Sequence, residues 1–199
     1  AAEQGNADAQ YQLGLCYENG IGVEADVVKA VHWYRLSAAQ GRADAQLALG
    51  LCCEKGTDPR LEEAVKWYRL SAEQGNAEAK RKLEEAAEAF RLSAERGDAS
   101  GQFGLGSFYY TGGPVEQNRE EAVKWFRLAA EQGHADAQFN LGDCSYWGQG
   151  TEQSDEEAVR WFRLSAEQGH ADAQLWLGLC YANGRGVEQS DEEAAAWYR

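Results

Sequence analysis

The sequence predicts an all-α protein built as an α/α solenoid of antiparallel helix pairs. Apolar residues recur at helical spacing through most of the chain, and the helix-favouring residues alanine, leucine, glutamate and arginine are abundant. A glycine opens each period, and fixed periods of roughly 20 to 50 residues are typical of solenoids. These glycines stand at steps of 36, 34, 22, 36 and 36 residues, at Gly5, Gly41, Gly75, Gly97, Gly133 and Gly169. We therefore expect about five repeats of roughly 36 residues plus one truncated repeat, the third.

The first helix of each pair is expected directly after the opening glycine, over residues 7–19 in the first repeat and 135–147 in the fifth. Its beginning is marked by side chains that cap a helix N-terminus. The predicted N-caps are Asn6, Asn76 and Asp98. A glycine also recurs inside this helix, although glycine there costs about 1 kcal/mol against alanine. We interpret it as a point of close helix approach, at Gly14, Gly50, Gly106, Gly142 and Gly178.

The second helix is expected after a glycine-rich loop. A capping-box pattern, serine followed three residues later by glutamate, begins it at Ser154 and Ser190, and Pro59 fits its first position in the second repeat. It ends at the next opening glycine, which predicts a positive φ there. Because only one or two residues link it to the next helix, neighbours should pack antiparallel. Its aromatic pairs are expected in the core: Trp33-Tyr34, Trp67-Tyr68, Trp125-Phe126, Trp161-Phe162 and Trp197-Tyr198.

The third repeat lacks the 14 residues equivalent to 142–155 of the fifth, which removes the glycine loop and both adjoining helix ends. An apolar stripe nevertheless survives at helical spacing, at Ala79, Leu83, Ala86, Ala87, Phe90 and Ala94. We predict one continuous helix over residues 77–96; the alternative is a degraded repeat whose first part is coil. The continuous helix would separate two blocks.

The predicted domain organisation follows from that helix. Residues 1–74 form an N-terminal block of two full repeats, preceded by the end of another helix. Residues 75–96 form the truncated repeat, and residues 97–199 form a C-terminal block of three repeats, the last incomplete. Helix faces exposed at the joint, 75–96, are candidates for homodimer formation.

The repeat pattern resembles that of a known family. It reads G-x-A-D-A-Q-x-x-L-G-x-x-Y-x-x-G-x-G-V followed by D-x-x-E-A-V-x-W-Y-R-L-S-A, and many positions match in several repeats. This is similar to the Sel1-like repeat (SLR) family, relatives of the tetratricopeptide repeats, across nearly the whole chain. The resemblance implies a right-handed α/α superhelical solenoid. It also implies a scaffold or adaptor for protein complexes, in which the first helices line a concave groove.

The acidic charge narrows the classes of partner. A formal net charge of −14 repels phosphate groups, so neither nucleic acid nor an anionic membrane is expected as a partner. No apolar run approaches the ~20 residues of a membrane-spanning helix, and no signal peptide is visible. The chain has no methionine, even at position 1, and we interpret it as a fragment or processed product.

No catalytic, cofactor or metal site and no disulfide is expected. Four cysteines share one repeat position, and neighbouring first helices should lie about 10 Å apart, too far for a disulfide. The cysteines are Cys16, Cys52, Cys144 and Cys180, with Cys53 adjacent to the second. Free thiols favour a reducing compartment such as the cytoplasm. The sequence shows no metal-ligand spacing and no nucleophile–base–orienter set, so we expect no enzyme.

Positions that differ between repeats are the candidate functional surface, because stacking requires core positions to recur. With the opening glycine as position one, positions eight, eleven and fifteen vary most and share one helix face. Large aromatic residues outside the shared pattern are typical binding residues. The candidates are Gln12, Leu15, Asn19, Lys55, Tyr110, Asn140, Asp143, Tyr146, Trp147, Trp176, Leu179 and Asn183. Relaxed surface drift is the alternative explanation of this variation.

We therefore expect a non-enzymatic protein–protein interaction scaffold. It would bind a peptide or partner protein in the groove lined by the first helices. The alternative is a glycan- or small-ligand-binding module, in which Trp147 and Trp176 act as stacking platforms beside asparagine and aspartate side chains.

Overall fold

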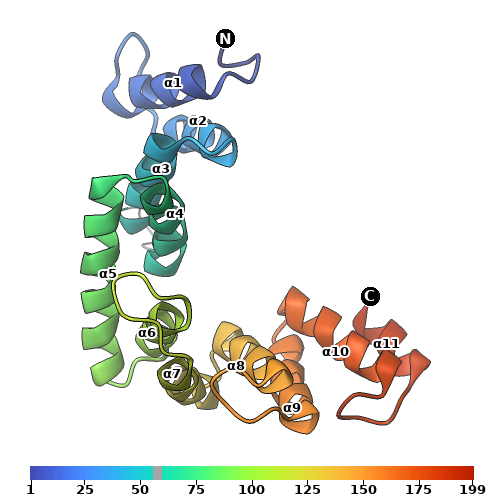
Figure 1. Ribbon diagram of the computed structural model, residues 1–199. Coiled ribbons are helices and arrows are strands. Elements are labelled where there is room, and N and C mark those ends of the chain that lie inside the picture. Colours follow the sequence, from blue (N-terminus) through green and yellow to red (C-terminus); the bar gives the residue numbers. More distant parts are fainter. Residues whose placement is uncertain (56–59) are drawn as a thin grey trace. The chain divides into compact units, whose positions relative to one another are not determined.

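The computed structural model describes residues 1–55 and 60–199, and over these residues it contains helices and no strands. The all-α prediction is therefore confirmed. In chain order the helices are α1 (Ala7–Asn19), α2 (Val27–Ala39), α3 (Ala43–Lys55), α4 (Leu61–Glu73), α5 (Ala77–Glu95), α6 (Ala99–Thr111), α7 (Arg119–Glu131), α8 (Ala135–Trp147), α9 (Asp155–Glu167), α10 (Ala171–Asn183) and α11 (Asp191–Trp197) (Figure 1). The expected role of Pro59 lies outside the described residues.

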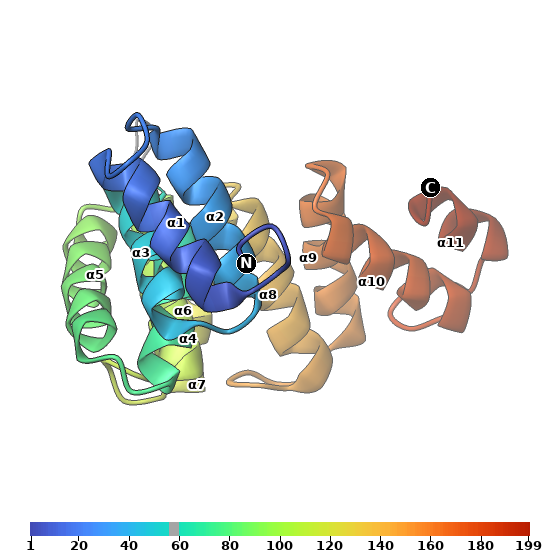
Figure 2. The same cartoon turned by 90° about the horizontal axis from the view of Figure 1, so that it is seen from above.

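The chain forms two compact units, Ala1–Ala86 and Ala87–Arg199, and the division falls inside α5. In the N-terminal unit, α1 pairs with α2 and α3 with α4, while α2 packs against α3. Figure 2 shows α1 and α2 side by side. In the C-terminal unit the pairs are α6–α7, α8–α9 and α10–α11, and α7 and α9 each contact the following pair. Each unit is thus a stack of helix pairs.

Hydrogen bonds at both ends hold the pair of α8 and α9 antiparallel. Near the end of α9, the Ser165 hydroxyl donates to the Ala135 carbonyl at the start of α8, at 2.8 Å. At the opposite end, the Ser154 backbone N–H donates to the Ser145 carbonyl at 2.9 Å. Equivalent bonds join α1 and α2. Buried polar groups need such partners, so these bonds fix the pairing.

The predicted capping box forms only in part. The Ser154 hydroxyl accepts a hydrogen bond from the Glu157 backbone N–H at 3.2 Å. The reciprocal bond is replaced, because the Ser154 N–H is already used by the preceding helix. The Glu157 carboxylate instead accepts from Trp161 Nε1 at 3.3 Å and from Arg127 at 3.0 Å. The glutamate therefore links α9 to α7.

The opening glycines make the turns between pairs, as predicted. All six have a positive φ, between 86° and 91°, a conformation that costs glycine little. At Gly169 the backbone N–H donates to the Ala166 carbonyl at 2.9 Å, and the His170 N–H donates to the Ser165 carbonyl at 3.3 Å. These bonds satisfy the last carbonyls of α9.

The glycine inside each first helix receives an aromatic ring from the second helix. A Cβ atom at Gly142 would lie 2.7 Å from Cδ1 of Phe162, closer than real contacts allow. The same contact recurs between the following pairs: Gly14 and Tyr34, Gly50 and Tyr68, Gly106 and Phe126, Gly178 and Tyr198. The predicted close helix approach is therefore confirmed, and these rings are fully buried except that of Tyr198.

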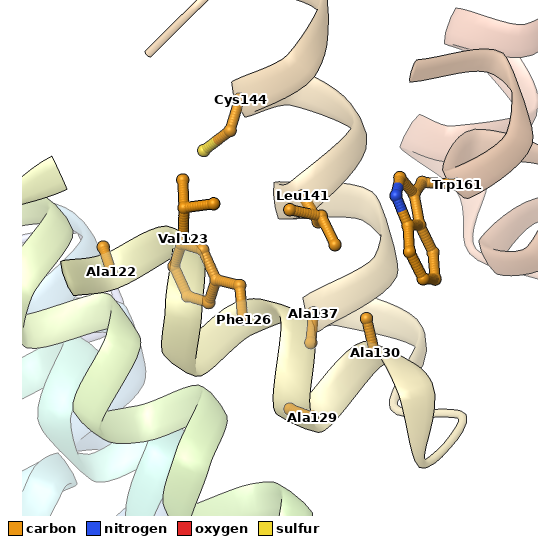
Figure 3. Packing of buried hydrophobic residues seen from close by; sticks show 9 residues of the cluster. All are labelled: Ala122, Val123, Phe126, Ala129, Ala130, Ala137, Leu141, Cys144 and Trp161. Carbon is orange, nitrogen blue, oxygen red and sulfur yellow. The ribbon is translucent and has the colours of Figure 1, made fainter. Parts of the chain in front are cut away.

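The core of the C-terminal unit runs from one pair into the next. Figure 3 shows Leu141 of α8 between Phe126 of α7 and Trp161 of α9, with Ala137 and Cys144 on the same face of α8. Burial of such apolar surface stabilises the stack by roughly 25 cal/mol per Å². The first helices thereby keep one face for the core and another for solvent.

The third repeat contributes a single helix, α5, with 19 residues from Ala77 to Glu95 and no break near residues 83–85. Its apolar stripe is buried: Ala79, Leu83, Ala86, Ala87, Phe90 and Ala94. At its C-terminal half, the Phe90 ring occupies the space where a Cβ of Gly104 would be, at 2.5 Å. This stripe is thus covered within one chain, and homodimer formation through residues 75–96 stays a prediction.

Candidate partner-binding face

The candidate residues of the N-terminal unit lie on α1 and at the end of α3. Gln12, Asn19 and Lys55 are exposed, and Leu15 is half-buried. The Asn19 side-chain amide donates to the Leu15 carbonyl at 2.9 Å, so this donor is used by its own helix. These side chains form no aromatic cluster within the described residues.

Three aromatic candidates on α8 and α10, Tyr146, Trp147 and Trp176, lie together in the C-terminal unit. The Trp147 and Trp176 rings are 6.0 Å apart and nearly perpendicular, at 87°. Both contact Tyr146, at 4.9 and 5.2 Å between ring centroids. Trp176 also stacks on the buried Phe162 at 6.1 Å. Trp147 is 52% exposed, whereas Tyr146 is only 8% exposed, so Tyr146 supports the tryptophans rather than facing solvent.

Tyr110 and Tyr146 both occupy position fourteen, and packing explains them. In the first two repeats this position is glutamate, and its carboxylate accepts from Tyr34 or Tyr68 at 2.5 or 2.6 Å. In the fourth and fifth repeats that tyrosine is replaced by phenylalanine, which has no hydroxyl. Position fourteen is then a tyrosine whose ring packs on the phenylalanine, at 6.0 and 6.4 Å.

The hydroxyls of these two tyrosines reach the following repeat. Tyr110 donates to the Gln149 side chain, and Arg185 donates to the Tyr146 hydroxyl. Gln149 and Arg185 occupy the same loop position in consecutive repeats. The two tyrosines therefore join neighbouring repeats, a structural role that their departure from the repeat pattern did not indicate.

Gly104, at the variable position eight, also has a packing explanation. It is buried beneath the Phe90 ring of α5, where no larger side chain fits. Asn140 is half-buried one turn before Asp143, and Leu179 and Asn183 lie exposed on α10. The Asn183 amide donates to the Leu179 carbonyl at 2.8 Å, as Asn19 does in α1. Trp147, Trp176 and Asp143 remain as candidates that repeat packing does not require.

Asp143 connects the tryptophans to the electrostatics of this face. Trp147 Nε1 donates to Asp143 Oδ1 at 3.1 Å. Burial raises the pKa of Asp143, while the Trp147 bond acts in the opposite direction. Among the described residues, no arginine or lysine pairs with this carboxylate. The protein thus keeps a half-buried carboxylate without a cation, a costly arrangement.

The two histidines that precede α8 and α10 have a structural role. His134 and His170 are N-caps: their Nδ1 atoms accept from the backbone N–H of Ala137 and Ala173 at 3.3 and 3.2 Å. Their rings stack on the phenylalanines at position seven of the preceding repeat, at 4.7 Å. These caps were not predicted, although both histidines directly precede an expected helix.

The cysteines of the described residues are free, and three are buried: Cys53, Cys144 and Cys180. Burial raises the pKa of Cys52 and of Cys180 to about 11, which disfavours the nucleophilic thiolate. Over residues 1–55 and 60–199, no group of three or more potential ligands is arranged to hold a metal ion. Within the same residues, no helix combines the length and apolar character needed to cross a membrane.

Comparison with known proteins identifies the repeat. The Sel1 repeat family model matches residues 7–41, 43–76, 99–134, 135–170 and 171–199, leaving α5 unmatched. Proteins of this family generally act as scaffolds for protein interactions. No curated protein matches the chain.

Two solved structures share both sequence and fold with the chain. One is c5321, described as a protective antigen present in uropathogenic Escherichia coli strains displaying an SLR fold. It is 37% identical with a TM-score of 0.54, over 98% of this chain and 45% of that one. The other is a Sel1 repeat protein from Oxalobacter formigenes, 35% identical with a TM-score of 0.54, over 98% of this chain and 84% of that one. The present chain thus spans less than half of the first relative and most of the second. It belongs to the Sel1 repeat family.

Proposed function

We propose that the chain is a non-enzymatic interaction module whose first helices in the C-terminal unit, α6, α8 and α10, bind a segment of a partner protein. The observation that carries this proposal is the pair Trp147 and Trp176. Tryptophans are enriched among residues that dominate protein interfaces. Trp147 is 52% exposed and Trp176 is half-buried. Neither ring is demanded by the repeat, since other side chains stand at these positions in the other repeats.

The surroundings of the two rings support a binding role. Trp176 is held by Phe162 and Tyr146, and Trp147 by Tyr146 and the Asp143 carboxylate. Rings held in this way lose little conformational entropy when a partner binds. A tryptophan that arose by neutral sequence drift at the surface would not need such support.

Recovery of partners from a lysate of the source cells tests the proposal. The chain would be immobilised as wild type and as the variants Trp147→Ala and Trp176→Ala. We expect at least one protein to bind wild type and to be lost from both variants. Leu128→Ala, which removes a similarly exposed apolar side chain from α7, is the matched control and should retain it. Equal recovery by all four proteins would refute the assignment to this face.

A further inference from the structure

The chain repeatedly places an arginine against both an aromatic ring and a carboxylate. The Arg185 guanidinium lies 3.9 Å from the centroid of the Tyr146 ring. It also donates twice to Asp155, at 2.7 and 3.0 Å. Arg42 repeats this arrangement, 4.7 Å from the Tyr11 ring centroid and 3.1 Å from the carboxylate two residues further along the chain. Such a site combines cation–π attraction with charge-assisted hydrogen bonds.

Trp147, Trp176 and Asp143, which we call the tryptophan corner, contain the same two elements. Two perpendicular rings meet at 6.0 Å, and the carboxylate lies against one of them. Within the described part of the chain, the arginine is missing from this arrangement. Arg119 is directed to the Tyr110 ring, at 5.4 Å from its centroid, and does not pair with Asp143.

Charge favours a basic occupant. The helices α6, α8 and α10 contain no lysine or arginine, and their charged residues are Asp136, Asp143 and Asp172. The whole chain has a formal net charge of −14. Long-range attraction would therefore steer a positively charged segment toward this face and repel an acidic one.

We infer that the tryptophan corner binds an arginine carried by a basic segment of a partner protein. This inference rests on the proposed function and specifies its partner. The planar guanidinium stacks on a tryptophan face and donates to the Asp143 oxygen that Trp147 leaves available. In the free protein, burial disfavours the charged form of this carboxylate, and the incoming cation compensates for that cost.

Selection from a phage-displayed library of random dodecapeptides tests the inference and does not require the natural partner to be identified. The bait is the full chain, and bound phage are compared with phage bound to Trp147→Ala. Enriched peptides are then synthesised with a fluorophore and their dissociation constants measured by anisotropy. We expect peptides that depend on Trp147 to contain arginine. Replacing that arginine by alanine should weaken binding about tenfold, the effect of ~1.4 kcal/mol.

Two charge-removing variants of the protein complete the test. Asp143→Asn preserves an acceptor for Trp147 Nε1 and should weaken binding of the selected peptides about tenfold. Asp172→Asn, the control on α10, should change their binding less than twofold. Peptides that need Trp147 but tolerate both arginine replacement and Asp143→Asn would overturn the arginine inference and leave the proposed function intact. Selection of no peptide that depends on Trp147 or Trp176 would overturn both.

Discussion

Gly142→Ala should destabilise the protein, although alanine is normally the better helix former. In an unconstrained helix this substitution gains about 1 kcal/mol. At Gly142, however, the new Cβ would lie 2.7 and 2.8 Å from two carbons of the Phe162 ring and 3.2 Å from the Ala158 carbonyl oxygen. Ordinary contacts begin near 3.4 Å, so the ring would have to retreat by about 0.7 Å, the difference between 3.4 and 2.7 Å.

Phe162 has little room for this movement. Its ring is fully buried and contacts Phe139 at 5.8 Å and Trp176 at 6.1 Å between centroids. Overpacking of a tight core costs about 1–3 kcal/mol. After the gain in helix propensity, we expect a net loss of up to about 2 kcal/mol in the free energy of unfolding.

Urea unfolding followed by circular dichroism measures this loss, and a double-mutant cycle tests its cause. Phe162→Leu removes the ring edge that faces Gly142. In that background Gly142→Ala should be neutral or stabilise by up to about 1 kcal/mol, because helix propensity then dominates. If Gly142→Ala had the same effect in both backgrounds, the ring contact would not be the reason why glycine and ring recur together across the repeats of this chain.

Three further predictions follow from the charged and polar contacts. Asp143→Asn should raise the free energy of unfolding at pH 7 by about 0.5–1 kcal/mol. Burial raises the pKa of Asp143, so the gain in stability of Asp143→Asn should disappear as the pH falls below 3.8, where the folded and the unfolded wild-type protein both bind the proton. A variant as stable as wild type at pH 7 would contradict this prediction. Burial alone would raise the pKa of Glu54, but bonds from Tyr68 and Lys82 outweigh it and lower the pKa. Tyr68→Phe should therefore cost about 1 kcal/mol at pH 7, and this loss should shrink below pH 4.5 as Glu54 becomes protonated, which urea titrations at both pH values would show. Arg185→Ala should cost about 1 kcal/mol in low salt and less in high salt, because its ion pair is partly exposed; a loss independent of salt would exclude the ion pair as its source.

The regular part of the fold was predictable because it depends on local signals. The glycine steps and helical periodicity gave the bounds of α1 and α8, and the N-caps Asn6, Asn76 and Asp98 bond as expected. These features require only neighbouring residues. The continuous helix α5 likewise follows from an apolar stripe without a breaker.

What the sequence did not reveal depends on contacts between distant residues. Tyr146 contacts Arg185, which is 39 residues away, and no local pattern distinguishes such a contact from an exposed aromatic residue. In the fourth and fifth repeats, phenylalanine replaces the tyrosine of the second helix, and tyrosine replaces the glutamate at position fourteen. Both replacements are visible in the sequence. Their connection could be interpreted only once the two positions were known to be in contact.

The residues that vary between repeats are of two kinds: those that packing explains and those that it does not. A residue that departs from the repeat is evidence of function only if packing does not account for the departure. Gly104, Tyr110 and Tyr146 are explained by packing against Phe90 and by hydrogen bonds to Gln149 and Arg185. Trp147 and Asp143 do not: the ring is largely exposed, and the carboxylate carries the cost of burial without a cation. If removing that charge stabilises the protein, selection has kept Asp143 against stability, as is common at binding sites. The same substitution should then weaken the binding of an arginine-containing peptide. One variant therefore tests both the destabilisation caused by Asp143 and its role in binding.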